Sequence, residues 1–154
     1  MQEQNEVHLK ITSTTMSPQD LETSIGIKAS DSWRLGDRQG VFGASARESG
    51  VLIDSGLPGF SSWENCLSAL LRKIEPQAVK IGALAGKCQI DVVCTLRQKA
   101  YPVLHFEAAD LRLLGAVGAR LNVDCFVLSD AGTRASAGAK RSGESGAGTK
   151  ALDY

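Results

Sequence analysis

The sequence predicts an α+β fold, a two-layer sandwich in which about five mainly antiparallel strands carry helices on one face, partly ferredoxin-like. Two observations predict it. Several short segments alternate apolar and polar residues with period two, as half-buried strands do, and others repeat apolar residues with helical spacing. The clearest unit is a strand–helix–strand succession over residues 103–127. The chain of 154 residues, 43% of them hydrophobic, is long enough for one domain with a core.

The first strand is predicted over residues 7–12, where every second residue is apolar. Residues 1–6 are polar, and we expect them to form a disordered N-terminus. Ser17 is a favourable N-cap, Pro18 suits the first position of a helix, and Gly26 ends that helix after about two turns.

A long, mostly irregular loop is predicted over residues 28–49, which several glycines interrupt. Loops of this length in domains are usually functional or mobile. A short strand follows over residues 51–53. The second helix begins after Ser61 or Ser62 and ends at Pro76. Its apolar positions have the best helical period of the chain: Trp63, Cys66, Leu67, Leu70, Leu71 and Ile74.

Two further strands are predicted over residues 88–97 and 103–107, and their short connection indicates a hairpin. A helix and a strand over residues 123–128 complete the domain. Residues 130–154 are rich in glycine, alanine and serine and have almost no large apolar side chains, so we expect a flexible tail. The predicted folded domain is therefore residues 7–129.

Charge and composition exclude several classes of function. Lysine and arginine together number 17, as do aspartate and glutamate, so no overall field attracts nucleic acid. No apolar run is long enough for a membrane span, and residues 1–6 lack the features of a signal peptide, so a cytoplasmic protein is expected. The cysteines form no C-x-x-C pair, and we interpret them as reduced thiols: Cys66, Cys88, Cys94 and Cys125.

No sequence motif identifies a reaction. A G-x-G-x-x-G turn after a strand, a G-x-S-x-G elbow and an H-E-x-x-H helix are all missing from the sequence. No catalytic residue and no cofactor is therefore predicted.

Four polar residues could share one face of the sheet: His8, Asp91, His105 and Asp124. Each lies at one of the polar positions in the apolar–polar alternation of its predicted strand. Alternation alone places polar residues on the outer face of a one-sided sheet, and this interpretation is preferred. The alternatives are a binding face or a metal site of two histidines and a carboxylate. We predict no metal site.

Two residues of the long loop complete the candidate surface. Trp33 could be a binding hot spot, although a tryptophan more often packs its loop onto the domain. Asp37 follows Gly36 and suits a turn. Asp124, if buried, would need donors, and we expect it to bond backbone groups or the Trp33 loop.

Several short stretches carry a resemblance to a known family: residues 16–27, Gly36-Asp37, residues 70–76 and residues 111–126, which close on Val-Asp-Cys-Phe. Together they resemble the bacterial family called domain of unknown function 4279. The chain departs from the family pattern at Ala29, where a proline is frequent. The resemblance implies the fold and a bacterial, cytosolic setting, and it implies no catalytic residues.

Three functions remain open at this point. The first is a non-enzymatic binding or interaction protein, which by analogy would resemble an immunity protein or an antitoxin. Its expected partner is another protein or a second copy of itself. No binding to nucleic acid or to a membrane is expected. The second is a regulatory domain that senses a small molecule. The third is an enzyme that uses carboxylates such as Asp37, Asp54, Asp91 or Asp124, which would have to converge in one cleft.

Overall fold

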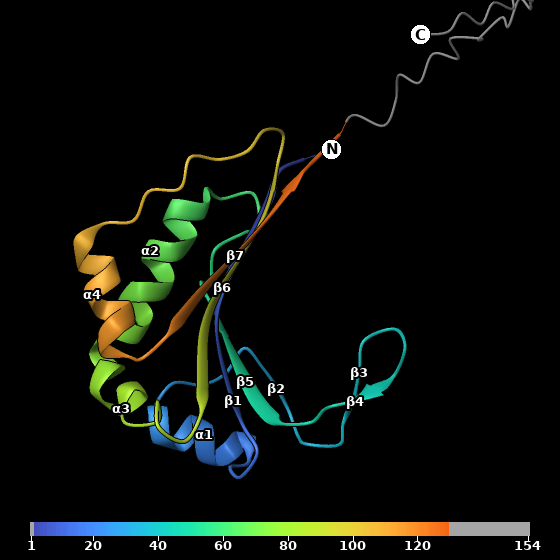
Figure 1. The fold of residues 1–154 in the computed structure, drawn as a ribbon, viewed down its shortest axis with the longest axis vertical. Helices are drawn as coiled ribbons and strands as arrows, with labels where there is room; N and C mark the ends of the chain where they lie inside the picture. The colour runs from blue at the N-terminus through green and yellow to red at the C-terminus, as the bar shows by residue number, and fades with distance from the viewer. Residues whose placement is uncertain (1, 130–154) are drawn as a thin grey trace, which may run out of the picture.

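The computed structural model of the chain describes residues 2–129, which form a five-stranded sheet, helices on one of its faces and a small separate hairpin (Figure 1). The fold class predicted from the sequence is confirmed. The tail expected over residues 130–154 lies outside the described residues.

The sheet has the strand order β2-β5-β1-β6-β7, so the first strand lies at its centre. Three of its pairings, β1 with β5, β1 with β6 and β2 with β5, are antiparallel, and β6 with β7 is parallel. The sheet is thus mixed but mainly antiparallel. The strands are β1 (Gln4–Ser13), β2 (Asp31–Trp33), β5 (Ser49–Asp54), β6 (Gln89–Gln98) and β7 (Arg120–Val127).

The first two helices begin and end where the sequence predicts. Ser17 caps α1 (Pro18–Ile25) with a capping box, and Gly26 ends it in the left-handed region, with φ 69°. Ser62 caps α2 through a hydrogen bond from the Asn65 backbone N–H. The remaining helical segments are α2 (Trp63–Ile74), a 3₁₀ turn (Glu75–Gln77), α3 (Ala78–Gly82) and α4 (Ala108–Ala116).

The hydrophobic core lies between the sheet and the helices. From β1 it receives Val7, Leu9 and Ile11, each at most 2% exposed, because alternate residues of a strand point to the same face. The apolar stripe predicted for α2 is buried over its whole length. The opposite face of the sheet carries no helix (Figure 1). We call it the open face.

Two irregular regions of the prediction are in fact ordered strands. Residues 4–6, expected to precede the domain, belong to β1, and Asn5 is buried there. The long loop predicted over residues 28–49 contains β2 and a hairpin of β3 (Arg38–Gln39) and β4 (Ala44–Ser45).

The strand predicted over residues 103–107 is wrong. Those residues form no strand, and Val103 is 86% exposed. Both edges of β6 are already occupied, by β1 and by β7, so no hairpin partner is available. The segment instead leads from β6 into α4, as a parallel pair of strands requires. Phe106 fixes it to the domain through a tilted ring contact with Trp63, at 5.6 Å between centroids.

Candidate functional site

The open face presents cross-strand rows of side chains set by the strand register. One row runs Asp54, His8, Val93 and Asn122 across β5, β1, β6 and β7. The next row runs Leu52, Lys10, Asp91 and Arg120. Side chains opposite one another in such rows are close enough to interact directly.

Asp91 is the buried charge of the open face. Although it lies on the polar phase of β6, it is 3% exposed. It accepts hydrogen bonds from Arg120 Nε (2.6 Å) and Nη2 (3.1 Å), from Gln89 (2.9 Å) and from Asn122 (3.3 Å). The Arg120 guanidinium, above all, holds the pKa of the Asp91 carboxyl below its usual range. Asp91 therefore holds the edge strand β7 in place and offers little to a ligand.

His8 is half-buried at the centre of the open face, opposite Asp54. Burial lowers the pKa of its imidazole, because desolvation disfavours the charged form; Glu6 and Asp54 oppose the effect. The ring is therefore held mainly neutral near pH 7.

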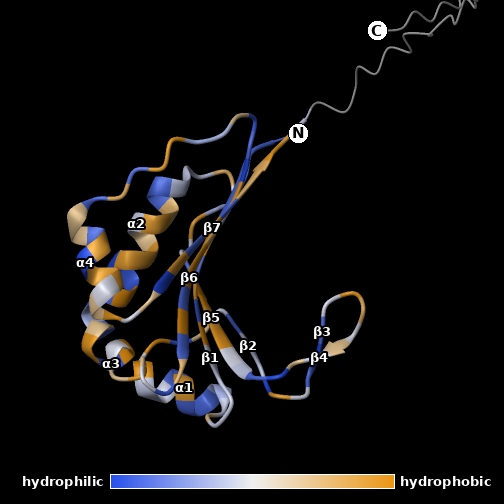
Figure 2. Ribbon diagram, viewed as in Figure 1, coloured by the Kyte–Doolittle hydropathy of each residue, from blue (hydrophilic) through white to orange (hydrophobic). Residues whose placement is uncertain are grey.

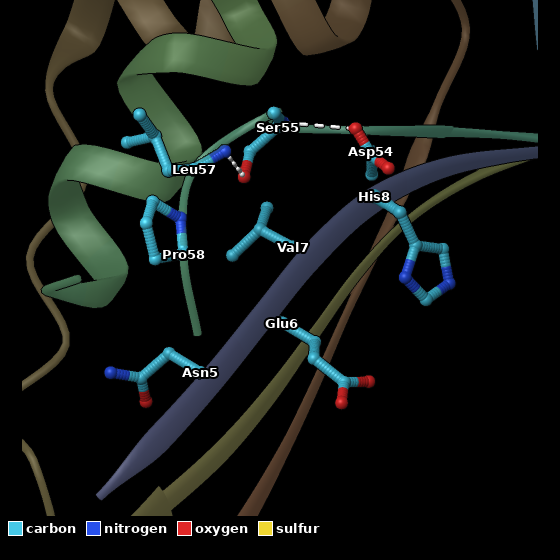
Figure 3. Close-up of a pocket in the computed structure, with 9 residues that line it drawn as sticks. Asn5, Glu6, Val7, His8, Asp54, Ser55, Leu57 and Pro58 are labelled. Atoms are coloured by element: carbon cyan, nitrogen blue, oxygen red, sulfur yellow. Dashed lines mark hydrogen bonds between the residues drawn. The ribbon is translucent and has the colours of Figure 1, made fainter. Parts of the chain in front are cut away.

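A groove opens beside His8 where β5 separates from β1. Two backbone hydrogen bonds bound it: Ser55 N–H donates to Val7 C=O (3.1 Å), and Asn5 N–H donates to Gly59 C=O (2.7 Å). The groove has a volume of about 560 Å³, with Leu57 among its apolar residues. In Figure 3, Glu6 and His8 point to the same side of β1. The lining residues are Asn5, Glu6, Val7, His8, Asp54, Ser55, Gly56, Leu57 and Pro58.

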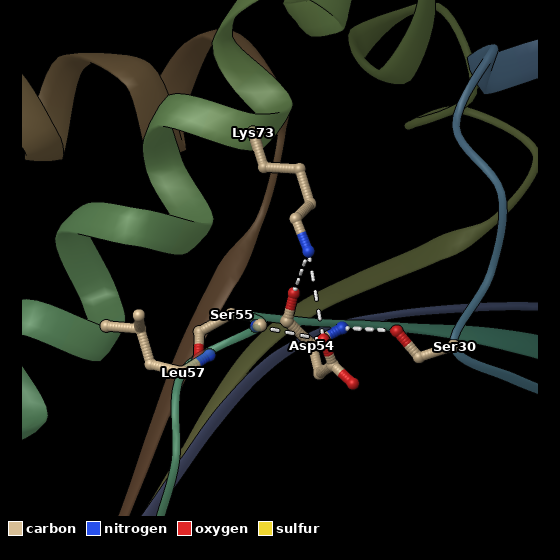
Figure 4. Close-up of polar contacts among 6 residues, drawn as sticks. Ser30, Asp54, Ser55, Leu57 and Lys73 are labelled. Atoms are coloured by element: carbon tan, nitrogen blue, oxygen red, sulfur yellow. Dashed lines mark hydrogen bonds and ion pairs between the residues drawn. The ribbon is translucent and has the colours of Figure 1, made fainter. Parts of the chain in front are cut away.

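Asp54 forms the rim of this groove and is itself held from several sides (Figure 4). Its backbone N–H donates to Ser30 Oγ (3.0 Å), and its carboxylate accepts from Gly56 N–H (2.9 Å). Lys73 Nζ, reaching from α2, donates to the Asp54 C=O (2.8 Å) and lies 3.7 Å from Oδ1. The rim is therefore fixed, while the Asp54 side chain remains 60% exposed.

Trp33 packs on the open face. Its indole ring covers Gly50, the opposite residue on β5, and Lys10 Nζ lies 5.7 Å from the ring centroid. Its Nε1–H donates to the Glu48 C=O at 2.9 Å. The ring is thus fixed against the sheet, in the packing role preferred from the sequence, and remains partly exposed.

Asp37 lies in a turn, as the sequence predicts. Its carboxylate accepts the Arg34 backbone N–H at 2.7 Å, and its own N–H donates to the Arg34 C=O at 3.0 Å. Its carboxylate is engaged in this turn.

The remaining two predicted residues do not join His8 and Asp91. His105 lies in the segment before α4, where its Nε2 is 3.0 Å from Glu107 Oε1 on the exposed surface. Asp124 does lie on the open face, but it is exposed in β7, at the edge opposite Trp33 in β2. The expected bond between Asp124 and the Trp33 loop is therefore wrong. The described residues contain no group of three histidine, cysteine or carboxylate side chains that could hold a metal ion.

The hairpin of β3 and β4 is a feature that the sequence reasoning missed. It extends from the sheet on the side away from the helices, and its tip is apolar (Figures 1 and 2). Val41 and Phe42 form the tip, 97% and 100% exposed. They lie between Gly40 and Gly43, both with positive φ, and Gly43 N–H donates to the Gly40 C=O at 3.2 Å. An apolar pair between two glycines is a turn signal that could have located this tip.

Comparison with known proteins gives one match. Residues 3–128 match the model of the family described as Domain of unknown function (DUF4279). The chain belongs to this family. The search of curated proteins and the search of solved structures found no match. Among the residues that the structure describes, none of the helices is long and apolar enough to cross a membrane.

Proposed function

We propose that this DUF4279 domain is a non-enzymatic binding domain that contacts a protein partner through the open face and the β3–β4 hairpin. One observation carries the proposal: Val41 and Phe42 are almost fully exposed at the tip of an arm that extends on the open-face side. Two adjacent apolar side chains held in water in this way are typical of an interaction site.

The arm is held by hydrogen bonds within the chain itself. Gly36 N–H donates to the Ala46 C=O (2.8 Å), and Ala46 N–H donates to the Asp37 C=O (2.7 Å), so the base of the arm is closed by two backbone hydrogen bonds. Trp33, at the start of the arm, is held by its bond to Glu48. A preorganised arm lowers the entropy cost of binding, which favours its use as an anchor in a partner groove.

The carboxylates support binding more than catalysis. The Asp91 carboxylate is engaged by Arg120 and the Asp37 carboxylate by its own turn. The Asp54 carboxylate accepts from Gly56 N–H and lies 3.7 Å from Lys73 Nζ. Acid–base catalysis needs two such groups in one cleft with separated pKa values, and these groups are spread over the fold. The setting proposed with this function is the bacterial cytosol, where by analogy the partner would be a toxin that the domain neutralises.

The test is affinity purification of the full chain from a native lysate. The wild type should recover a stoichiometric protein partner, and the double variant Val41→Ser/Phe42→Ser should lose it by at least about tenfold, since apolar anchors dominate such contacts. Val79→Ser is the matched control, because Val79 is 88% exposed on α3 and belongs to neither surface. The proposal would be contradicted if a partner bound the Val41→Ser/Phe42→Ser variant as well as it binds Val79→Ser, or if the wild type recovered no partner.

The groove beside His8 favours a second candidate, a domain that senses a small molecule. Its volume of about 560 Å³ suits a metabolite, and Glu6 and Asp54 on its rim favour a cationic one. A library of small organic amines should then raise the melting temperature of the wild type and not of Glu6→Gln/Asp54→Asn. No shift with any amine would remove this candidate.

A further inference from the structure

The outer edge of β7 is a long strand edge without a partner among residues 2–129. The sheet has two edges, and the other one, β2, is only three residues long, whereas β7 has eight. Short edge strands resist pairing with other chains, as do edges interrupted by proline, lysine or a bulge. The sequence of β7, RLNVDCFV, contains neither proline nor lysine, and its pairing with β6 runs without interruption from Arg120 to Val127. Its two charged side chains are Arg120, which is bonded to Asp91, and Asp124.

The register shows which backbone groups of β7 have no hydrogen-bond partner within residues 2–129. Leu128 N–H donates to the Gln98 C=O, so residue 128 directs its N–H toward β6. In a parallel pair, alternate residues direct their N–H and C=O to the same neighbour. The even-numbered residues of β7 therefore bond to β6. The odd-numbered ones direct theirs outward: Leu121, Val123, Cys125 and Val127.

We propose that this edge pairs antiparallel with β7 of a second copy of the chain, with Val123 at the two-fold axis, and joins two five-stranded sheets into one. An interface of this kind is isologous, so the strand must be complementary to itself. The odd-numbered residues of the two strands supply the hydrogen bonds. Odd-numbered residues lie opposite odd-numbered ones and even opposite even, so the helices of both copies lie on the same side of the joined sheet.

The side chains of β7 fit this register. With Val123 at the axis, Leu121 lies opposite Cys125 of the second copy, and Asn122 lies opposite Asp124 of the second copy. Arg120 lies opposite Phe126, a pairing of a cation with an aromatic ring. No like charges meet.

The neighbouring registers are less favourable. Centring the pair on Asp124 sets two carboxylates opposite each other, which destabilises a strand pair. Centring it on Asn122 gives an Arg120–Asp124 ion pair but shortens the overlap from residues 120–126 to residues 120–124. The longer overlap satisfies more of the free backbone groups, so Val123 is the preferred centre.

This inference is independent of the hairpin and of any foreign partner. In the dimer the two open faces form one continuous surface, and the two β3–β4 hairpins lie beyond its far edges, because β2 and β7 are opposite edges of each sheet.

The first measurement is sedimentation of the full chain. The wild type should have twice the 16.3 kDa of one chain. Val123→Pro should weaken the dimer about 30-fold or more, because it removes the two N–H groups that bond at the axis. It removes no bond to β6, since proline is tolerated where the N–H of an edge strand points outward. A monomeric wild type at high micromolar concentration, or a dimer that Val123→Pro leaves unchanged, would overturn the proposal.

The second measurement tests the register even if the proline variant fails to fold. Val123→Cys in a Cys125→Ser background should form a disulfide between two copies on mild oxidation, because only the residue at the axis lies opposite itself. Ser32→Cys in the same background is the matched control on the exposed edge strand β2 and should stay reduced. Equal crosslinking of the two variants, or none with Val123→Cys, would refute the β7 pairing.

Discussion

Arg120 and Asp91 form a two-pronged ion pair between the last two strands of the sheet, with Nε 2.6 Å from Oδ1 and Nη2 3.1 Å from Oδ2. The two residues are register partners in the parallel pairing of β6 with β7. The carboxylate is buried and the guanidinium is largely exposed, so Arg120 covers Asp91 from the solvent side. The pair fixes the start of β7 and explains why an aspartate can be buried on the open face.

Replacing Asp91 should destabilise the domain. Asp91→Ala leaves Gln89, Arg120 and Asn122 without their acceptor, and a buried polar group that loses its hydrogen-bond partner costs about 1–3 kcal/mol. Because solvent reaches Arg120, we expect a loss in the lower part of that range, about 1–2 kcal/mol. Urea unfolding monitored by circular dichroism measures it.

The matched control is Asp124→Ala, on the adjacent strand and the same face. Asp124 is exposed, so its removal should change the free energy of unfolding by less than about 0.5 kcal/mol. Equal effects of the two variants would show that the Arg120–Asp91 pair does not stabilise the fold.

The contribution of Asp91 should depend on pH. Its pKa is lowered in the folded state, chiefly by Arg120, so the folded protein holds the carboxylate ionised more firmly than the unfolded chain does. The stabilisation is present above the unfolded pKa of about 3.9 and is lost as pH falls through the lower folded value. The stability difference between wild type and Asp91→Asn, measured by urea unfolding, should therefore be larger at pH 7 than near pH 2. A difference that does not change between these pH values would refute the assignment.

His8 should make stability depend on pH in a different range. Burial lowers its pKa, so below about 6.5 the unfolded chain binds a proton more readily than the folded one. Stability rises with pH wherever the unfolded state binds more protons. The contribution of neutral His8 to stability is therefore lost as pH falls from about 6.5 toward the folded pKa. His8→Gln should therefore lose less stability than the wild type between pH 7.5 and pH 5. Parallel losses in urea unfolding would indicate that His8 does not contribute.

The sequence predicts elements whose pattern is decided locally. The alternation in residues 7–12 and the helical stripe from Trp63 to Ile74 both correspond to buried faces. Residues 103–107 also alternate, but a strand needs a free neighbour, and β6 has none. Alternation shows which residues could line a face and does not show whether an edge is available.

The candidate site was harder to predict, because a local pattern of residues does not show which distant segments become neighbours in the fold. Asp91 follows the polar phase of its strand, yet it is buried by Arg120, which lies 29 positions later in the chain. His105 follows the polar phase of a strand that does not form. The exposed tip at Val41 and Phe42 depends on a hairpin whose strands have only two residues each, too short for any period to show.

The contact between Trp33 and Gly50 gives the last prediction. A Cβ built on Gly50 would lie 2.7 Å from Cε2 of the indole, closer than side-chain atoms can pack, so Gly50→Ala must displace the ring. Overpacking of this kind costs about 1–3 kcal/mol, and the displaced ring should shift the tryptophan emission to longer wavelength. Gly86→Ala is the matched control, because a Cβ there meets nothing within 4 Å and the backbone is not in the left-handed region. Its stability should be unchanged or slightly raised. If Gly50→Ala leaves both the emission and the unfolding midpoint as in the wild type, Trp33 is not fixed against β5, and the base of the hairpin is not the rigid support that the proposed binding function requires.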